Sequence, residues 1–292
     1  MRSLLFGALG VILGGCGTPA DLAGTAAASI RIDSTTMTSD QMAQVRSDLD
    51  LLSTLNLSMS PEDAGLVGVN DGSSAETVRY LTARVKWILG PSFDDGTIQI
   101  AQTNYPFQPQ VGLTGMIDNA DTPTLTTIAV NYGSSYYKKG RTAGKLYAIP
   151  FEGRPIEVKS PRTGIIQLAG AHFSSGTDKF SSNSFALRYK RILTLLHEAK
   201  HSDGNGLTTA LSHVDCPFSH PDVNLRGAVG ACDACTNGPY AVASIYAKYI
   251  YDTCADCSAA EKEYLRIYQA AQARRVLTDI ATFCDATPEG TL

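Results

Sequence analysis

Apolar residues recur at steps of three or four in the N-terminal and C-terminal parts of the chain. This spacing predicts amphipathic helices over residues 38–52, 73–88, 237–249 and 258–283. Three of these helices begin with Ser or Thr followed three residues later by Glu or Gln, the pattern of a capping box. We expect the last helix to remain regular through Phe283, with Ile280 and Phe283 facing inward.

In the middle of the chain the apolar spacing changes to two, which indicates β-strands. The strands are predicted between Gly, Pro, Asn and Asp turns, at residues 97–100, 125–132, 145–149, 155–158 and 164–173. Because no helix is predicted between them, the sheet should be mostly antiparallel. The strand at 164–173 is expected either at an open sheet edge or in the core, and His172 within it is expected to be structural.

The helix that follows this sheet carries His197-Glu198-Ala199-Lys200-His201 and should stop at Gly204. Residues four apart lie one turn from each other on the same helix face, so the imidazoles of His197 and His201 can bind one cation. Glu198 lies about 100° around the axis, close enough to reach a water molecule beside that cation. The pattern therefore predicts a metal site with a general base next to it.

Two imidazoles alone bind zinc weakly for a catalytic site, so a third protein ligand is needed. We expect His213, because residues 207–211 can return along the helix after the Gly-rich reversal and present it. His220 is the second choice. The remaining candidates are Asp203, Asp215 and Asp222.

His197-Glu198-x-x-His201 resembles the signature of the zincin metallopeptidases. The resemblance implies one Zn²⁺ per chain, bound by the two histidines, with Glu198 activating water to hydrolyse a peptide or protein substrate. It also implies a sheet edge that pairs with extended substrate, for which residues 164–173 are the candidate. The resemblance covers only this helix and its flanks, and Lys200 and Ser202 depart from the usual zincin pattern.

Composition and the start of the chain indicate an extracytoplasmic protein. A formal net charge of −4 without a basic run excludes nucleic acid as an expected partner. Residues 1–15 have a basic end, an apolar core and small residues before Cys16, and resemble a bacterial lipoprotein signal peptide. The resemblance implies a lipid on Cys16 that attaches the protein to the cell envelope. Because Gly17 is not Asp, the outer membrane is expected, with residues 16–37 as a tether.

The other six cysteines all follow the HExxH motif. Two Cys-x-x-Cys pairs have the spacing of a zinc site, but the oxidising compartment and the helix predicted between them favour three disulfides instead. The pairing of Cys216 with Cys232 is preferred because it closes one short loop. The six are Cys216, Cys232, Cys235, Cys254, Cys257 and Cys284.

The sequence as a whole predicts a zincin-like α+β fold. Residues 38–203 should form the N-terminal helices, the antiparallel sheet and the active-site helix, and residues 204–292 a disulfide-linked helical part that completes the metal site. The predicted function is zinc-dependent hydrolysis of peptide bonds by a lipid-anchored envelope protein. The alternatives are a non-catalytic envelope lipoprotein with a structural metal site or binding surface, and a zinc hydrolase of non-peptide amides in the cell wall.

Overall fold

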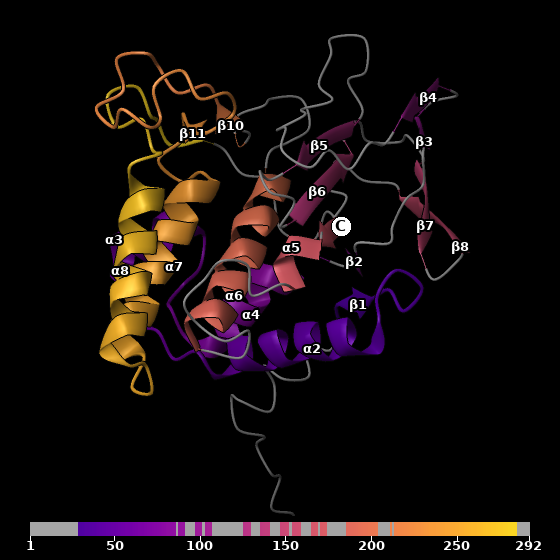
Figure 1. The fold of residues 1–292 in the computed structure, drawn as a ribbon, viewed down its shortest axis with the longest axis horizontal. Coiled ribbons are helices and arrows are strands. Elements are labelled where there is room, and N and C mark those ends of the chain that lie inside the picture. The colour runs from indigo at the N-terminus through magenta and orange to yellow at the C-terminus, as the bar shows by residue number, and fades with distance from the viewer. Residues whose placement is uncertain are drawn as a thin grey trace, which may run out of the picture.

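The structure, a computed structural model, describes residues 29–85, 87–90, 185–203, 211 and 213–284, together with the strands and the short helix named below between residues 97 and 173. The helix α6 (Phe185–Lys200) lies at its centre, continued by a 3₁₀ turn, η2 (His201–Asp203). In Figure 1, α6 runs between a pair of C-terminal helices and a sheet, with α2 (Ser39–Thr54) across one end.

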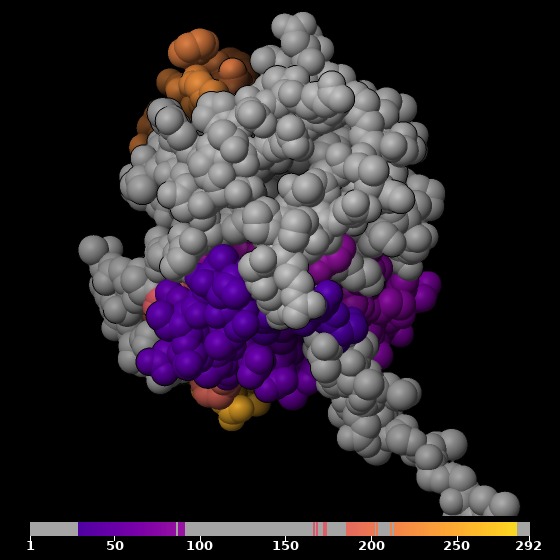
Figure 2. Space-filling view, turned by 90° about the vertical axis from the view of Figure 1, so that its right-hand side faces the viewer, coloured from indigo at the N-terminus to yellow at the C-terminus, as the bar shows by residue number. Residues whose placement is uncertain are grey.

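The N-terminal helices begin as their caps predict. Thr38 forms the capping box that opens α2, with Thr38 Oγ1 and the Gln41 side chain each bonding the other residue's backbone N–H. Ser73 caps α4 (Ser74–Thr82) through the backbone N–H of Glu76. A short helix that was not predicted, α3 (Pro61–Val67), lies between them. In Figure 2 these N-terminal residues, in indigo and purple, form a continuous region of the surface.

The predicted helix at 73–88 is wrong beyond Thr82, because its last residues form strand β2 (Trp87–Leu89). β2 lies between β1 (Arg31–Ile32) and β9 (Ile165–Leu168) and is parallel to both. Pairing on both sides satisfies the backbone of β2, and this outweighs a spacing that also fits a helix. β1 and the buried Ile30 also belong to the globule, although residues 16–37 were predicted to be a tether.

Most strand pairs are antiparallel, as predicted, and they form two main sheets. The larger sheet has the order β1-β2-β9-β6-β5, where β6 is Ser135–Gly140 and β5 is Leu125–Ala129. The smaller has the order β4-β3-β7-β8, formed by Thr103–Pro106, Thr97–Ile100, Tyr147–Phe151 and Arg154–Val158. β9 is an inner strand, and α5 (Gly170–Phe173) replaces its predicted end, so the edge alternative for residues 164–173 is wrong.

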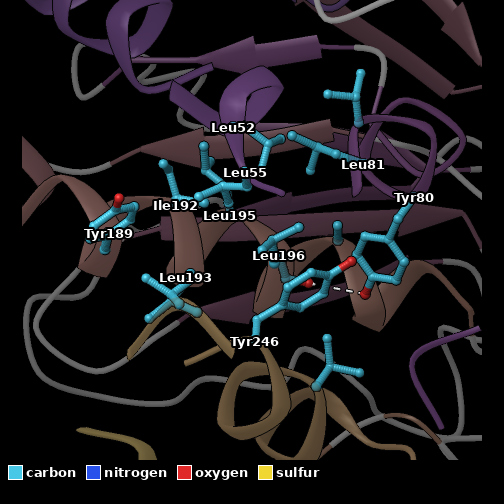
Figure 3. Close-up of a cluster of buried hydrophobic side chains, with 14 of the residues drawn as sticks. Leu52, Leu55, Tyr80, Leu81, Tyr189, Ile192, Leu193, Leu195, Leu196 and Tyr246 are labelled. Atoms are coloured by element: carbon cyan, nitrogen blue, oxygen red, sulfur yellow. Dashed lines mark hydrogen bonds between the residues drawn. The ribbon is translucent and has the colours of Figure 1, made fainter. Parts of the chain in front are cut away.

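The core surrounds α6. Its Ile192, Leu195 and Leu196 pack among leucines of the N-terminal helices on one side and Tyr246 on the other (Figure 3). The hydroxyl of Tyr80 donates to the Leu196 carbonyl at 3.1 Å, and the Tyr80 ring meets Tyr246 edge-on. A helix buried around most of its circumference can place even its polar residues in a water-poor interior.

Buried ion pairs fix the helical segment in its middle and at its C-terminal end. In the middle of α6, Arg191 forms a bidentate pair with Asp48 of α2. At the C-terminal end, Asp203 accepts two hydrogen bonds from Arg84, at 2.8 and 3.0 Å, and lies 3.0 Å from Lys200 Nζ. These side chains are almost completely buried, so each charge depends on its partner.

The C-terminal part is helical and contains three disulfides, as predicted. It consists of α7 (Pro239–Thr253), α8 (Ala259–Ala273) and a two-residue ladder between β10 (His213–Val214) and β11 (Cys232–Asp233). The Cys216–Cys232 pairing is confirmed, and the other bridges are Cys235–Cys284 and Cys254–Cys257.

The predicted helix at 258–283 is wrong beyond Ala273. The chain there leaves the helix and bonds to β11: Asp233 N–H donates to the Arg275 carbonyl, and Leu277 N–H donates to the Asp233 carbonyl. Ile280 and Phe283, predicted to face inward, are 65% and 61% exposed. The backbone donors and acceptors of β11 thus determine where α8 ends.

We expect Asp203→Ala to destabilise the protein by about 3–5 kcal/mol, because it leaves the charges of Arg84 and Lys200 buried without their carboxylate. Urea unfolding followed by circular dichroism measures this loss. The control is Glu263→Ala, which removes the exposed partner of Arg266 and should leave the unfolding midpoint nearly unchanged. Equal midpoints for the two variants would contradict a structural role for the buried ion pairs.

Candidate metal centre

His197 and His201 lie at the end of the central helix, one turn apart. His197 is in the last turn of α6 and His201 is the first residue of η2. Their ring centroids are 5.2 Å apart, and the side chains are 5% and 1% exposed. The predicted spacing therefore brings two imidazoles to one place in the interior.

His213 completes a group of three. It lies on β10, and its Nε2 is 3.2 Å from Nε2 of His197. One nitrogen from each of the three rings lies within 4.8 Å of the others, so the group could hold a metal ion. Within the described residues, no other three His, Cys, Asp or Glu side chains meet in this way.

The nitrogens that face away from this group are hydrogen-bonded. His201 Nδ1 lies 2.8 Å from the carbonyl of Leu211, and His213 Nδ1 lies 2.8 Å from Oδ1 of Asp233. His197 bonds to the backbone of Pro239, which has only its carbonyl to offer. A carbonyl can only accept, so the ring nitrogen bound to it carries the proton and the other nitrogen of that ring carries the lone pair. Such outer hydrogen bonds orient histidines for metal binding.

Burial keeps the imidazoles of His197 and His213 in the neutral form that binds metals. It lowers the pKa of His213 to about 3, with a further contribution from the positive charge of Arg275. The pKa of His197 is also well below its usual value, first because of burial and then because of the other two histidines. Neutral imidazoles need no deprotonation before they coordinate a cation.

Asp233 and Tyr240 contact the histidines. The contact of Asp233 with His213 was not predicted from the sequence. The Tyr240 ring stacks on His213 with centroids 4.2 Å apart and lies 4.8 Å from His197. Burial raises the pKa of Tyr240 to about 12, so its hydroxyl stays protonated. Burial also raises the pKa of Asp233 to about 8, opposed by the N–H groups of Tyr240 and Ala241 and by Arg275. The ionised carboxylate therefore depends on neighbouring positive charge.

Glu198 is fully buried on α6. Its negative charge is among the causes that raise the pKa of Tyr240, and also that of Tyr268 on α8, where burial again comes first. The Glu198 carboxylate is therefore close enough to both tyrosines to affect their ionisation. It lies in a water-poor region on the helix that carries His197, where a carboxylate interacts strongly with nearby charge.

The other ligand candidates have structural partners instead. Asp203 is bound by Arg84 and Lys200, which also gives a structural reason for the Lys at position 200. Nδ1 of His220 accepts the N–H of Asp222, and its Nε2 lies 3.0 Å from the Arg274 carbonyl.

The two remaining ligand candidates, Asp215 and Asp222, also have hydrogen-bond or ion-pair partners. Asp222 pairs with Arg274, and Asp215 accepts the N–H of Gly230. His172 is buried on α5, outside the metal group. Cys16 lies outside the described residues.

The fold and site together define an α+β protein with a disulfide-linked C-terminal part and a buried three-histidine centre. No protein-family model, curated protein or solved structure matches the chain. The geometry of this centre and the chemistry of its residues therefore carry the functional inference.

His213→Ala should abolish tight zinc binding, because it leaves the centre with two imidazoles. Zinc per chain, measured by mass spectrometry after dialysis against trace zinc, tests this expectation. His220→Ala is the matched control: it removes another buried histidine of the C-terminal part that lies outside the centre and should retain the metal. If His220→Ala loses zinc while His213→Ala keeps it, the ligand assignment is wrong.

Proposed function

We propose that this protein is a single-zinc hydrolase of peptide bonds. The observation that carries the proposal is the convergence of His197, His201 and His213 in a buried centre, with the buried Glu198 next to His197 in the sequence of α6. Three protein ligands with one open position is the arrangement of catalytic zinc sites, whereas structural sites are usually closed by four. The zincin-like HExxH pattern on α6 supports the same reaction.

The donor set fits zinc. Three imidazoles without thiolates suit Zn²⁺, although Cu²⁺, Ni²⁺ and Fe²⁺ also bind imidazole, so zinc is chosen from the HExxH resemblance. When bound, Zn²⁺ supplies a Lewis acid that lowers the pKa of water and polarises a substrate carbonyl. The hydrogen bonds to Leu211, Asp233 and Pro239 hold the three rings in the orientation that binding requires.

Glu198 supplies the proton transfers of the reaction. As general base its carboxylate takes the proton of the attacking water, and as general acid it returns that proton to the leaving nitrogen. Its position next to His197 in the helix places base and metal ligand on one rigid element, which keeps their separation constant during the reaction.

The substrate is proposed to be an extended peptide. β9 is an inner strand and cannot pair with it, but among the described strands β5 is an edge of the larger sheet, and an edge strand is where an extended peptide can be added. A zinc hydrolase of non-peptide cell-wall amides would use the same residues. Peptide and non-peptide amide substrates offered side by side separate these two reactions.

An envelope location is part of the proposal. The three disulfides are consistent with an extracytoplasmic protein, because such bonds persist in oxidising compartments. None of the helices in the described part of the chain combines the length and apolar character of a membrane span. Attachment through a lipid on Cys16, to the outer membrane, remains the sequence-based prediction.

Glu198→Gln should lower peptide hydrolysis by a factor of about 10²–10⁴, because the amide cannot accept the water proton. Zinc should remain at one ion per chain, because the three imidazoles are unchanged. Turnover of a fluorogenic peptide library and metal analysis of the same samples measure both quantities. Glu263→Gln, an exposed glutamate on α8, is the control and should match the wild-type protein. Full activity of Glu198→Gln would rule out its role as base.

The second candidate function is a non-catalytic protein with a structural metal site. It is favoured by the depth of the centre, since no ligand is more than 8% exposed and Glu198 is fully buried. In this case zinc should raise the melting temperature strongly while no peptide is cleaved by either the wild-type protein or Glu198→Gln. X-ray absorption that counts a fourth protein ligand would favour this candidate; a bound water would favour the enzyme.

A further inference from the structure

The side chain of Asp233 joins the metal centre to the start of a helix. Its Oδ1 lies 2.8 Å from His213 Nδ1, and its Oδ2 accepts the backbone N–H of Tyr240 at 2.7 Å. The N–H of Ala241 also bonds to this carboxyl group. One carboxylate therefore serves a ligand histidine with one oxygen and the first turn of α7 with the other.

The start of α7 lacks a cap of its own. Its N-cap is Gly238, which offers no side-chain hydrogen bond to the exposed N–H groups of the first turn. A Cβ at Gly238 would lie 2.5 Å from Oδ2 of Asp233, so a larger residue would displace this carboxylate. Asp233 thus acts in place of the N-cap side chain, and the absence of a side chain at Gly238 allows its approach.

The backbone of Asp233 is fixed independently of its side chain. Asp233 pairs directly with His213 in the β10–β11 ladder, and the neighbouring Cys232 is bound to Cys216. Its N–H and carbonyl bond to Arg275 and Leu277 of the segment after α8. Because these restraints hold the Cα in place, a change of the carboxyl group alters the position of His213 without removing the ladder.

We propose that Asp233 is a positioning residue that sets both the tautomer and the direction of His213 and couples metal binding to the first turn of α7. His213 Nε2 faces the metal group, 3.2 Å from His197 Nε2, so a coordinated His213 carries its ring proton on Nδ1 and donates it to Asp233 Oδ1 at 2.8 Å. This inference rests on the proposed metal binding and adds to it a residue outside the HExxH motif. Metal binding, which holds His213, should also hold Asp233 and its bonds to α7.

The first experiment compares the metal affinity of Asp233→Asn with that of the wild-type full-length chain. Asparagine has the shape of aspartate but only one acceptor oxygen, so it cannot accept from both His213 and the α7 N–H groups. Zn²⁺ affinity is measured by competition with a chelator, and the visible spectrum of the Co²⁺-loaded protein reports the ligand geometry. Asp233→Asn should weaken zinc binding by about 10–100-fold and change the Co²⁺ spectrum.

The matched control is Ser258→Ala. Ser258 is the N-cap of α8, with a side chain that accepts from Glu261, so this variant also removes a helix cap but leaves the histidines and their partners unchanged. It should bind zinc within twofold of the wild-type affinity. If Ser258→Ala weakens binding as much as Asp233→Asn, the effect is general destabilisation and the positioning role is refuted.

A second measurement needs no variant. Hydrogen exchange of the Tyr240 backbone N–H, followed by mass spectrometry or NMR, should be slower in the Zn²⁺-loaded wild-type protein than in the metal-free protein. The N–H of Lys262 in the first turn of α8, which donates to Ser258, should exchange equally in both. Unchanged exchange at Tyr240 would refute the coupling to α7.

The outcomes distinguish this inference from the proposed function. A wild-type protein that binds neither Zn²⁺ nor Co²⁺ overturns the metal centre and this inference with it. A wild-type protein that binds zinc, with Asp233→Asn equal to it in affinity and spectrum, overturns the role of Asp233 and leaves the proposed hydrolase standing.

Discussion

The burial of α6 between the sheet, the N-terminal helices and the α7–α8 pair is the constraint on which the rest of the structure depends. A helix enclosed in this way cannot shift or rotate without opening the core around Leu195 and Leu196. The buried ion pairs in its middle and after its C-terminus, Arg191–Asp48 and Arg84–Asp203, add a further cost to any displacement, since each requires its partner in place. His197, Glu198 and His201 are therefore presented from a fixed support.

The third histidine reaches this support from a different kind of structure. β10 and β11 are only two residues long, too short to be stable alone. The Cys216–Cys232 bridge and the bonds of Asp233 to the segment after α8 fix the ladder that carries His213. The Cys216–Cys232 bridge thus contributes directly to the geometry of the candidate centre, and not only to the stability of the chain.

Lys200 and Asp233 have roles that the HExxH motif does not predict. Lys200 departs from the usual zincin pattern because it is used in the interior, where its ammonium lies 3.0 Å from Asp203. Asp233 belongs to no motif, yet it bonds both His213 and the N-terminus of α7. The Lys200–Asp203 pair has i,i+3 spacing on one helical segment, but the contacts of Asp233 join residues that only the fold brings together.

Local patterns in the sequence were sufficient for features that depend on neighbouring residues. The caps at Thr38, Ser73 and Ser258, the helix that carries His197 and His201, and the Cys216–Cys232 bridge follow from short-range spacing and the redox compartment. His213 was the preferred third candidate, but the sequence left His220 and three aspartates open. The helices predicted to extend through Ile88 and Phe283 end earlier, because the backbone there bonds to strands that are distant in the sequence.

What only the tertiary structure decided was which polar side chains meet in the interior. A buried carboxylate or imidazole must find partners wherever the fold provides them. Asp203 bonds to Arg84 and His220 lies within hydrogen-bond distance of the Arg274 carbonyl, so neither belongs to the metal group. His213 instead faces His197. Spacing along the chain determines which residues share a helix face, but contacts between residues far apart in sequence depend on packing, and the candidate centre combines both.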